Sequence, residues 1–165
     1  MNFSTISSMF GINPNNFKPA DIEPIRSDAG FVYYLEQDTE KIPCPFCNSL
    51  NNITIKGYYF KNINCSINEH KKDILRIKMV RFKCHKCNKS FNKSIQGVQK
   101  YGYISNYVKK LIINSFYTTT TFEKIASTYH VSSATIINIF DNDIADAKRL
   151  ILPKILCIDE FYFSR

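Results

Sequence analysis

Four cysteines form two closely spaced pairs whose spacing suits a metal ion. "CPFC" at 44–47 and "CHKC" at 84–87 are both Cys-x-x-Cys motifs, and each motif brings two thiolates onto one tight turn. Two such turns supply the four sulfur ligands of a tetrahedral Zn²⁺ site, which leaves no position for water and is therefore structural. The pattern predicts a zinc ribbon that binds Zn²⁺ through Cys44, Cys47, Cys84 and Cys87. Disulfide bonds and a redox-active thiol pair are the alternatives.

Other sulfur and imidazole groups lie near these motifs in the sequence. Cys65 and His70 fall within "KNINCSINEH" at 61–70, a segment expected to be a loop, and His85 lies inside the second motif. Because the paired cysteines already complete a tetrahedral shell, all three residues are expected to stay outside it. Cys157 lies in an apolar run and is expected to be a small buried hydrophobe.

The positive charge of the chain is concentrated around the second cysteine pair. The net charge is +8, but residues 1–40 carry −4, residues 41–110 carry +13 and residues 111–165 carry −1. This distribution favours a polyanionic partner, although a solvated lysine-rich surface would give the same composition. Six cations are expected to contact DNA phosphates: Lys78, Arg81, Lys83, Lys86, Lys89 and Lys93. Phe82 and Phe91 lie between them in the sequence.

The cysteine pairs are separated by a segment that indicates β-structure. Side-chain alternation predicts a strand at 74–84, and aromatic and β-branched residues predict strands at 30–37 and 53–60. Strands between the two pairs can return the second pair to the first. Within 74–84 the alternation slips by one residue between Met79 and Val80, which predicts a β-bulge or a change of the buried face.

From residue 104 the hydrophobic period becomes helical. Helices are predicted at 104–117, from about residue 122, and from Ser132 or Ser133 onward, with Pro153 ending the last one. Residues 122–140 also have the spacing of a helix-turn-helix, with His130 at a turn position where glycine is common and a left-handed backbone is needed. The inward positions would be Ile125, Ala126, Val131, Ile136 and Ile139.

The second helix of this segment carries polar side chains on its other faces. Ser133, Thr135, Asn138 and Asn142 would then be able to meet bases or phosphates. The helix is not basic, so positioning or dimerisation is a further role for it, with the ribbon supplying the charge. An ordinary helical hairpin within a core is the alternative.

These elements predict an α+β protein built from small consecutive parts. Residues 1–40 are expected to be an N-terminal segment with one strand, 41–98 a β-rich zinc ribbon, and 99–150 a helical helix-turn-helix domain. The sequence starts without a basic n-region and has no apolar run of membrane-spanning length. A cytoplasmic protein with reduced cysteines and no membrane partner is therefore expected.

The order of these parts resembles the N-terminal portion of a bacterial insertion-sequence transposase. Such transposases carry a zinc ribbon, a helix-turn-helix and a DDE catalytic domain of RNase H-like fold. The resemblance is carried by "RFKCHKCNKSF" at 81–91 and by "LPKILCIDEF" at 152–161. It implies double-stranded DNA as the partner, namely the terminal inverted repeats of the element. A second copy of the chain is a further candidate partner.

The resemblance also gives a role to Asp159. It implies that residues 151–165 begin the catalytic domain and that Asp159 is the first acidic ligand of two catalytic Mg²⁺ ions. The second Asp and the final Glu of the triad have no counterpart, and Glu160 would point to the opposite face of the strand. The chain is therefore expected to be a truncated, catalytically incomplete transposase, with Mg²⁺ required only in a full-length enzyme.

Two other functions fit the same parts. A stand-alone transcription regulator would use the ribbon and the helix-turn-helix in the same way. Further carboxylates encoded downstream in another reading frame would favour the transposase over the regulator. A zinc-stabilised protein-interaction module is the third hypothesis, and it would lack salt-dependent binding to duplex DNA.

Overall fold

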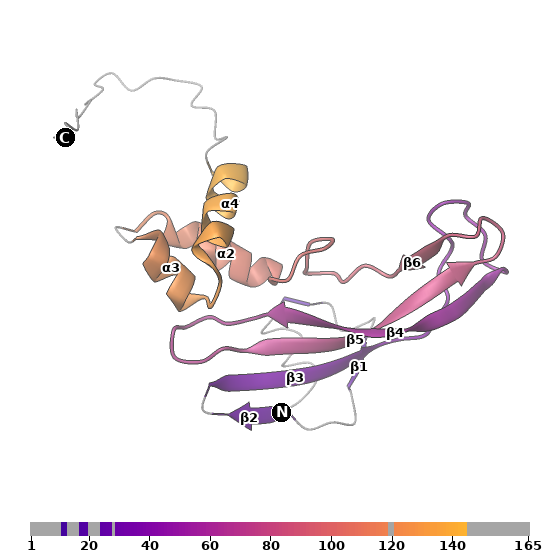
Figure 1. Cartoon of the computed structure of the whole chain (residues 1–165), viewed down its shortest axis with the longest axis horizontal. Coiled ribbons are helices and arrows are strands. Elements are labelled where there is room, and N and C mark those ends of the chain that lie inside the picture. Colours follow the sequence, from indigo (N-terminus) through magenta and orange to yellow (C-terminus); the bar gives the residue numbers. More distant parts are fainter. Residues whose placement is uncertain (1–10, 13–16, 20–23, 28, 119–120, 145–165) are drawn as a thin grey trace, which may run out of the picture.

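The computed structural model describes residues 11–12, 17–19, 24–27, 29–118 and 121–144. Within these residues the chain is a mixed α+β protein with a six-stranded sheet and three helices (Figure 1). The strands are β1 (Phe17–Pro19), β2 (Ile25–Ser27), β3 (Gly30–Gln37), β4 (Ile53–Asn64), β5 (Ile74–Cys84) and β6 (Ser90–Asn92). The helices are α2 (Asn106–Ser115), α3 (Phe122–Thr128) and α4 (Ser133–Asp143).

β5 is the central strand of the sheet. β4 runs antiparallel along one edge of β5, from Ile53 opposite Cys84 to Asn64 opposite Ile74. On the other edge, β3 runs parallel to the first half of β5 and β6 antiparallel to the second half. The strands predicted at 30–37 and 74–84 are confirmed. The strand predicted at 53–60 continues to Asn64, so residues 61–64 belong to β4 rather than to a loop.

The N-terminal segment holds more β-structure than was predicted. One strand was expected within residues 1–40, but β1 and β2 also lie there, and both pair antiparallel with the same edge of β3. Each of these edge strands is three residues long, which is too short to show an alternating pattern, and β1 ends at a proline that an edge strand tolerates. Because β3 pairs with β5, the sheet crosses the boundary predicted at residue 40.

Two cores lie along β5, and the slip in its alternation marks the change between them. Leu75–Met79 contributes to one core and Val80–Cys84 to the other. The slip is therefore a change of the buried face, while the irregular pairing lies in the partner strand, between Ile55 and Gly57 of β4. We name the first the sheet core: Ile12, Phe17, Tyr33, Leu35, Ile63, Cys65, Leu75, Ile77, Met79, Ile95 and Val98. We name the second the cysteine core: Cys44, Ile53, Val80, Phe82, Cys84 and Phe91.

The three helices share a third core. Its buried members are Val108, Ile112, Ile125, Ala126, Tyr129, Ile136 and Ile139, with Val131 packed against them, so the predicted inward positions are confirmed. Each helix begins at a hydroxyl side chain, Ser105, Thr121 or Ser132, which accepts a hydrogen bond from the backbone N–H three residues later. His130, between α3 and α4, has the left-handed φ of 51° that its turn position requires. None of the helices in the described residues is long and apolar enough to cross a membrane.

The helices are fixed to the end of β4 through Asn64. Its backbone N–H donates to the carbonyl of Tyr103 at 2.7 Å. Its side-chain amide donates to the carbonyls of Tyr129 and His130 at 2.9 and 3.1 Å. Figure 1 shows that the helices and the cysteine end of the hairpin rise from opposite ends of the sheet on the same side. The connection from β6 to α2 lies between them, and we call this the concave side.

Candidate metal centre and basic surface

The four predicted ligands come together at one end of the β4–β5 hairpin. Their sulfur atoms all lie within 4.8 Å of one another. The Cys44–Cys87 and Cys47–Cys84 sulfur pairs are each 3.6 Å apart. With Zn–S bonds of about 2.3 Å, neighbouring sulfurs of a tetrahedral site lie about 3.8 Å apart. The four sulfurs can therefore hold one metal ion, and their spacing is compatible with Zn²⁺.

The thiols are not joined as disulfides. All four cysteines of the cluster are free, and a sulfur separation of 3.6 Å is far longer than the roughly 2.05 Å of an S–S bond. Both of these sulfur contacts join a cysteine of one pair to a cysteine of the other. A redox-active thiol pair would instead bring together the two cysteines of a single motif.

Both cysteine turns have the same backbone design. An asparagine follows each pair, and Asn48 and Asn88 have left-handed φ values of 56° and 57°. Asparagine is one of the few residues that adopts this conformation at low cost. In each turn the N–H of the first cysteine donates to the carbonyl five residues later, at 3.0 Å in the first turn and 2.9 Å in the second. An asparagine directly after a Cys-x-x-Cys motif is therefore a second sequence signal for this kind of turn, in addition to the spacing of the cysteines.

Two of the thiols differ strongly in acidity. Hydrogen bonding from the backbone N–H of Cys87, together with smaller contributions from Lys86 and neighbouring thiols, lowers the pKa of Cys84 to about 7 despite burial. At Cys47 the backbone N–H of Ser49 acts to lower the pKa, but burial and the neighbouring thiols outweigh it and raise the pKa to about 11. Because only the thiolate binds a metal, binding of Zn²⁺ at this cluster would release thiol protons and would therefore depend on pH.

The cluster is half enclosed by apolar side chains. Cys44 and Cys84 are 1% and 0% exposed, whereas Cys47 and Cys87 are partly exposed. The rings of Phe82 and Phe91 stack beside the buried sulfurs with their centroids 5.7 Å apart. This shell limits the access of water to one ligand of each pair, as expected of a structural site.

Cys65, His70 and His85 lie outside the cluster, as expected. Cys65 belongs to the sheet core, where burial raises its pKa to about 12. The Nε2 atom of His85 is 2.9 Å from the hydroxyl of Thr54, and His70 lies in the exposed connection between β4 and β5. Cys157 lies outside the described residues.

Four of the six predicted phosphate-contacting cations lie at the cysteine end of the hairpin. Lys89 places its ammonium nitrogen 4.6 Å from the ring centroid of Phe46, so it bridges the two cysteine turns. Lys56 also belongs to this group. It was not predicted from the sequence, because its place depends on the register of the hairpin, in which the adjacent Gly57 lies opposite Arg81. These residues are exposed or partly exposed, and we call them the basic end: Lys56, Arg81, Lys83, Lys86 and Lys89.

The remaining two cations are held in ion pairs with residues of, or just after, β3. Lys78 lies beside Glu36 in the parallel pairing of β3 with β5, and the charged atoms are 3.1 Å apart. Lys93 is buried, and its ammonium group pairs with Asp38. Lys93 therefore does not belong to the exposed cationic surface, and its predicted contact with phosphate stays a prediction from sequence.

The polar residues of α4 do not form one open surface. Thr135 and Asn138 line a cleft of about 830 Å³ between the helices and the end of the sheet. Ser133 is exposed and lies outside the lining of that cleft. The cleft is rich in amide and basic groups, and its other polar lining residues include Asn62, Asn64, Lys72, Lys109 and Asn142. The face of α4 that carries Thr135 and Asn138 therefore borders a cleft that is also lined by residues of β4.

Asp159 and the rest of residues 151–165 lie outside the described residues. The predicted catalytic role of Asp159 therefore stays a prediction from sequence. Comparison with protein-family models, with curated proteins and with solved structures finds no match to this chain.

Proposed function

We propose that this chain is a zinc-stabilised module that binds double-stranded DNA, of the kind found at the N-terminus of insertion-sequence transposases. One observation carries the proposal: the four sulfurs and the five cations of the basic end lie at the same end of the β4–β5 hairpin. A Zn²⁺ ion held there would stiffen the turn that carries Lys86 and Lys89. Cations on a stiff turn meet phosphates without first being ordered, which favours binding.

The α3–α4 pair supports a second contact with the duplex. The left-handed turn at His130 and the buried positions on both helices have the form expected of a helix-turn-helix. We infer that the duplex lies along the concave side, where α4 and the cysteine end both rise (Figure 1). Ser133 would then contact a phosphate near the start of α4, and Asn138 would approach the duplex from the edge of the cleft.

The finer parts of this proposal come from the sequence. They are the assignment of residues 41–98 to a zinc ribbon and 99–150 to a helix-turn-helix, and of Asp159 to the first strand of an RNase H-like domain. The transposase assignment predicts inverted repeats in the DNA that flanks the coding region. A coding region with no such repeats on either side would favour the transcription regulator instead.

The binding proposal is tested with zinc-loaded protein and a fluorescent 20-base-pair duplex. We expect about one zinc per chain by atomic absorption and a rise in fluorescence anisotropy on titration. Chelation of the metal should abolish both, and re-addition of Zn²⁺ should restore them. A zinc-loaded protein that leaves the anisotropy unchanged at low salt would contradict the proposal and favour the protein-interaction module.

A further inference from the structure

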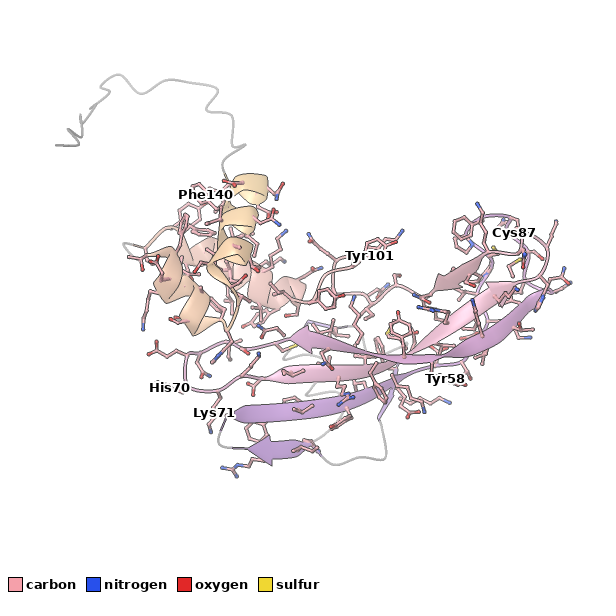
Figure 2. All side chains as sticks on the ribbon, viewed as in Figure 1. Tyr58, His70, Lys71, Cys87, Tyr101 and Phe140 are labelled. Carbon is pink, nitrogen blue, oxygen red and sulfur yellow. The ribbon has the colours of Figure 1, made fainter. Side chains whose placement is uncertain are left out.

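Two tyrosines on the concave side are much more exposed than aromatic rings usually are. Tyr101 and Tyr103 lie in the connection between β6 and α2, and their exposed fractions are 80% and 69%. Figure 2 shows Tyr101 standing away from the sheet, in the stretch between the helices and the end that carries Cys87. Exposed rings grouped in one place indicate a binding surface more often than single exposed rings do.

The backbone at Tyr101 is held in an unfavourable conformation. Its φ of 67° is left-handed, which costs a residue with a bulky side chain about 1–2 kcal/mol. The adjacent residue is Gly102, which would adopt this conformation more easily, and its N–H donates to the carbonyl of Gln99 at 2.8 Å to close the turn. The turn therefore has a tyrosine at a position where glycine would cost less conformational energy, which agrees with a binding role for the ring.

The two tyrosines border a hollow at the outer edge of β4. Its volume is about 420 Å³, and it is lined by Tyr59, Phe60, Lys61, Asn62, Tyr101 and Tyr103. Tyr59 already has partners in the fold, since its hydroxyl accepts a hydrogen bond from Asn92 at 3.0 Å and Arg81 lies over its ring. Phe60 is 54% exposed, but the guanidinium of Arg76 lies over its ring, 4.6 Å from the centroid. Tyr101 and Tyr103 are the most exposed rings in this lining.

Each of these two tyrosine rings has a lysine beside it. The ammonium nitrogen of Lys61 lies 5.6 Å from the ring centroid of Tyr103, and that of Lys100 lies 5.4 Å from the centroid of Tyr101. Burial lowers the pKa of Lys61, so its ammonium has lost part of its hydration, and a nearby phosphate would compensate for that loss.

We propose that this hollow binds an unpaired base of a DNA strand, with Tyr101 and Tyr103 against the base and Lys61 and Lys100 at the flanking phosphates. The proposal rests on the DNA-binding function proposed above and deepens it. Flat rings beside cations match the alternation of base and phosphate along a single strand. A paired base keeps its faces covered by its neighbours and cannot offer them to a tyrosine. An acidic peptide would satisfy the lysines but would leave the rings without a flat partner.

The position of the hollow fits a strand that leaves a bound duplex. The hollow is lined by residues of β4 and of the connection from β6 to α2, and Figure 1 shows that this connection runs between the helices and the cysteine end of the hairpin. A duplex held at both ends of the concave side would pass the hollow at its middle. An unpaired base at that point could enter without displacing the contacts at either end.

The test compares three duplexes of the same length and flanking sequence. One is fully paired, one carries a single extra thymine, and one carries an abasic site in place of that thymine. We expect the zinc-loaded protein to bind the thymine bulge about 5- to 150-fold more tightly than the abasic bulge, which is the range for stacking of one base on aromatic side chains. Binding to the fully paired duplex should match binding to the abasic bulge.

Variants then assign the effect to the rings. The double change Tyr101→Ala and Tyr103→Ala should remove the preference for the thymine bulge and leave affinity for the paired duplex unchanged. Tyr101→Phe should keep the preference, because the ring remains. The matched control is Tyr117→Ala, since Tyr117 is 82% exposed but lies beyond the far end of α2. Because the chain has no tryptophan, quenching of tyrosine fluorescence by the thymine bulge is an independent readout.

The outcomes separate this inference from the function on which it rests. Equal affinity for the thymine and abasic bulges, with strong binding of the paired duplex, would overturn the inference alone. Retention of the preference in the double alanine variant would also overturn it. A protein that binds the thymine bulge through these tyrosines but fails to bind the paired duplex would refute the proposed duplex binding and support this site.

Discussion

The salt dependence of duplex binding should report how many cations meet phosphates. The basic end contains five cations, whereas Lys78 and Lys93 are already paired with carboxylates. Five phosphate contacts on B-DNA give a slope of about −4.5 for the logarithm of the association constant against the logarithm of the salt concentration. Affinity should therefore fall about 500-fold between 50 and 200 mM salt.

Single substitutions test which cations contribute to that slope. Lys86 is exposed on the second cysteine turn, so Lys86→Ala should make the slope shallower by about 0.9. Lys78→Ala is the matched control, because Lys78 pairs with Glu36 on the sheet, and it should leave the slope unchanged. The assay is fluorescence anisotropy with the fully paired duplex at constant pH and zinc, repeated at four or more salt concentrations.

Two results would refute this reasoning. If Lys78→Ala flattens the slope as much as Lys86→Ala does, the ion pair with Glu36 does not keep Lys78 from the phosphates. If the wild-type slope is shallower than about −2, the cations of the basic end do not act together on one duplex. The second result would also move the phosphate contacts to the helices.

Four further predictions concern the metal and the cores. Lys93→Ala leaves the carboxylate of Asp38 without its partner and should lower the free energy of unfolding by about 3 kcal/mol in urea titration; a loss well below 1 kcal/mol would mean that the pair is not effectively buried. Cys84→Ser should remove the bound zinc and with it most of the order of the cysteine core, whereas Cys65→Ala should keep about one zinc per chain by atomic absorption. In the zinc-loaded protein, Cys65 should resist iodoacetamide at pH 8, because burial raises its pKa to about 12 and the thiolate forms only as the pH approaches that value; peptide mass mapping that finds rapid alkylation there would contradict this. Asn64→Ala removes two hydrogen bonds to carbonyls after α3 and should cost about 2 kcal/mol, visible as faster amide hydrogen exchange in α3.

The elements with strong periodicity could be predicted from the sequence. The alternation in 74–84 and the helical stripes after residue 104 are local signals, and the capping residues Thr121 and Ser132 mark where α3 and α4 begin. The cysteine cluster was predictable for a related reason. Each pair forms its own turn, and antiparallel strands between the pairs bring the turns together whatever the rest of the fold does.

The features that were missed depend on contacts between distant segments. Glu36 and Lys78 are neighbours because β3 runs parallel to β5, and nothing local to either residue signals that pairing. The same holds for Lys93 and Asp38, so the ion pairs of two of the six predicted phosphate-contacting cations could not be foreseen. Asn138 is exposed, so the prediction that it can meet bases or phosphates stays a prediction, but the cleft that it borders could not be predicted, because that cleft depends on the attachment of the helices to Asn64.

The parallel pairing of β3 with β5 has a consequence for how the chain folds. Lys78 follows its neighbour Glu36 by 42 residues, whereas β4 and β5 are joined by a short connection and can pair as soon as both are synthesised. Long-range pairings form slowly because the intervening chain must first be ordered. During translation, the edge of β3 that pairs with β5 therefore stays unpaired until the β4–β5 hairpin has left the ribosome. We expect refolding to proceed in the same order, with the hairpin first and the docking of β3 as the slow step.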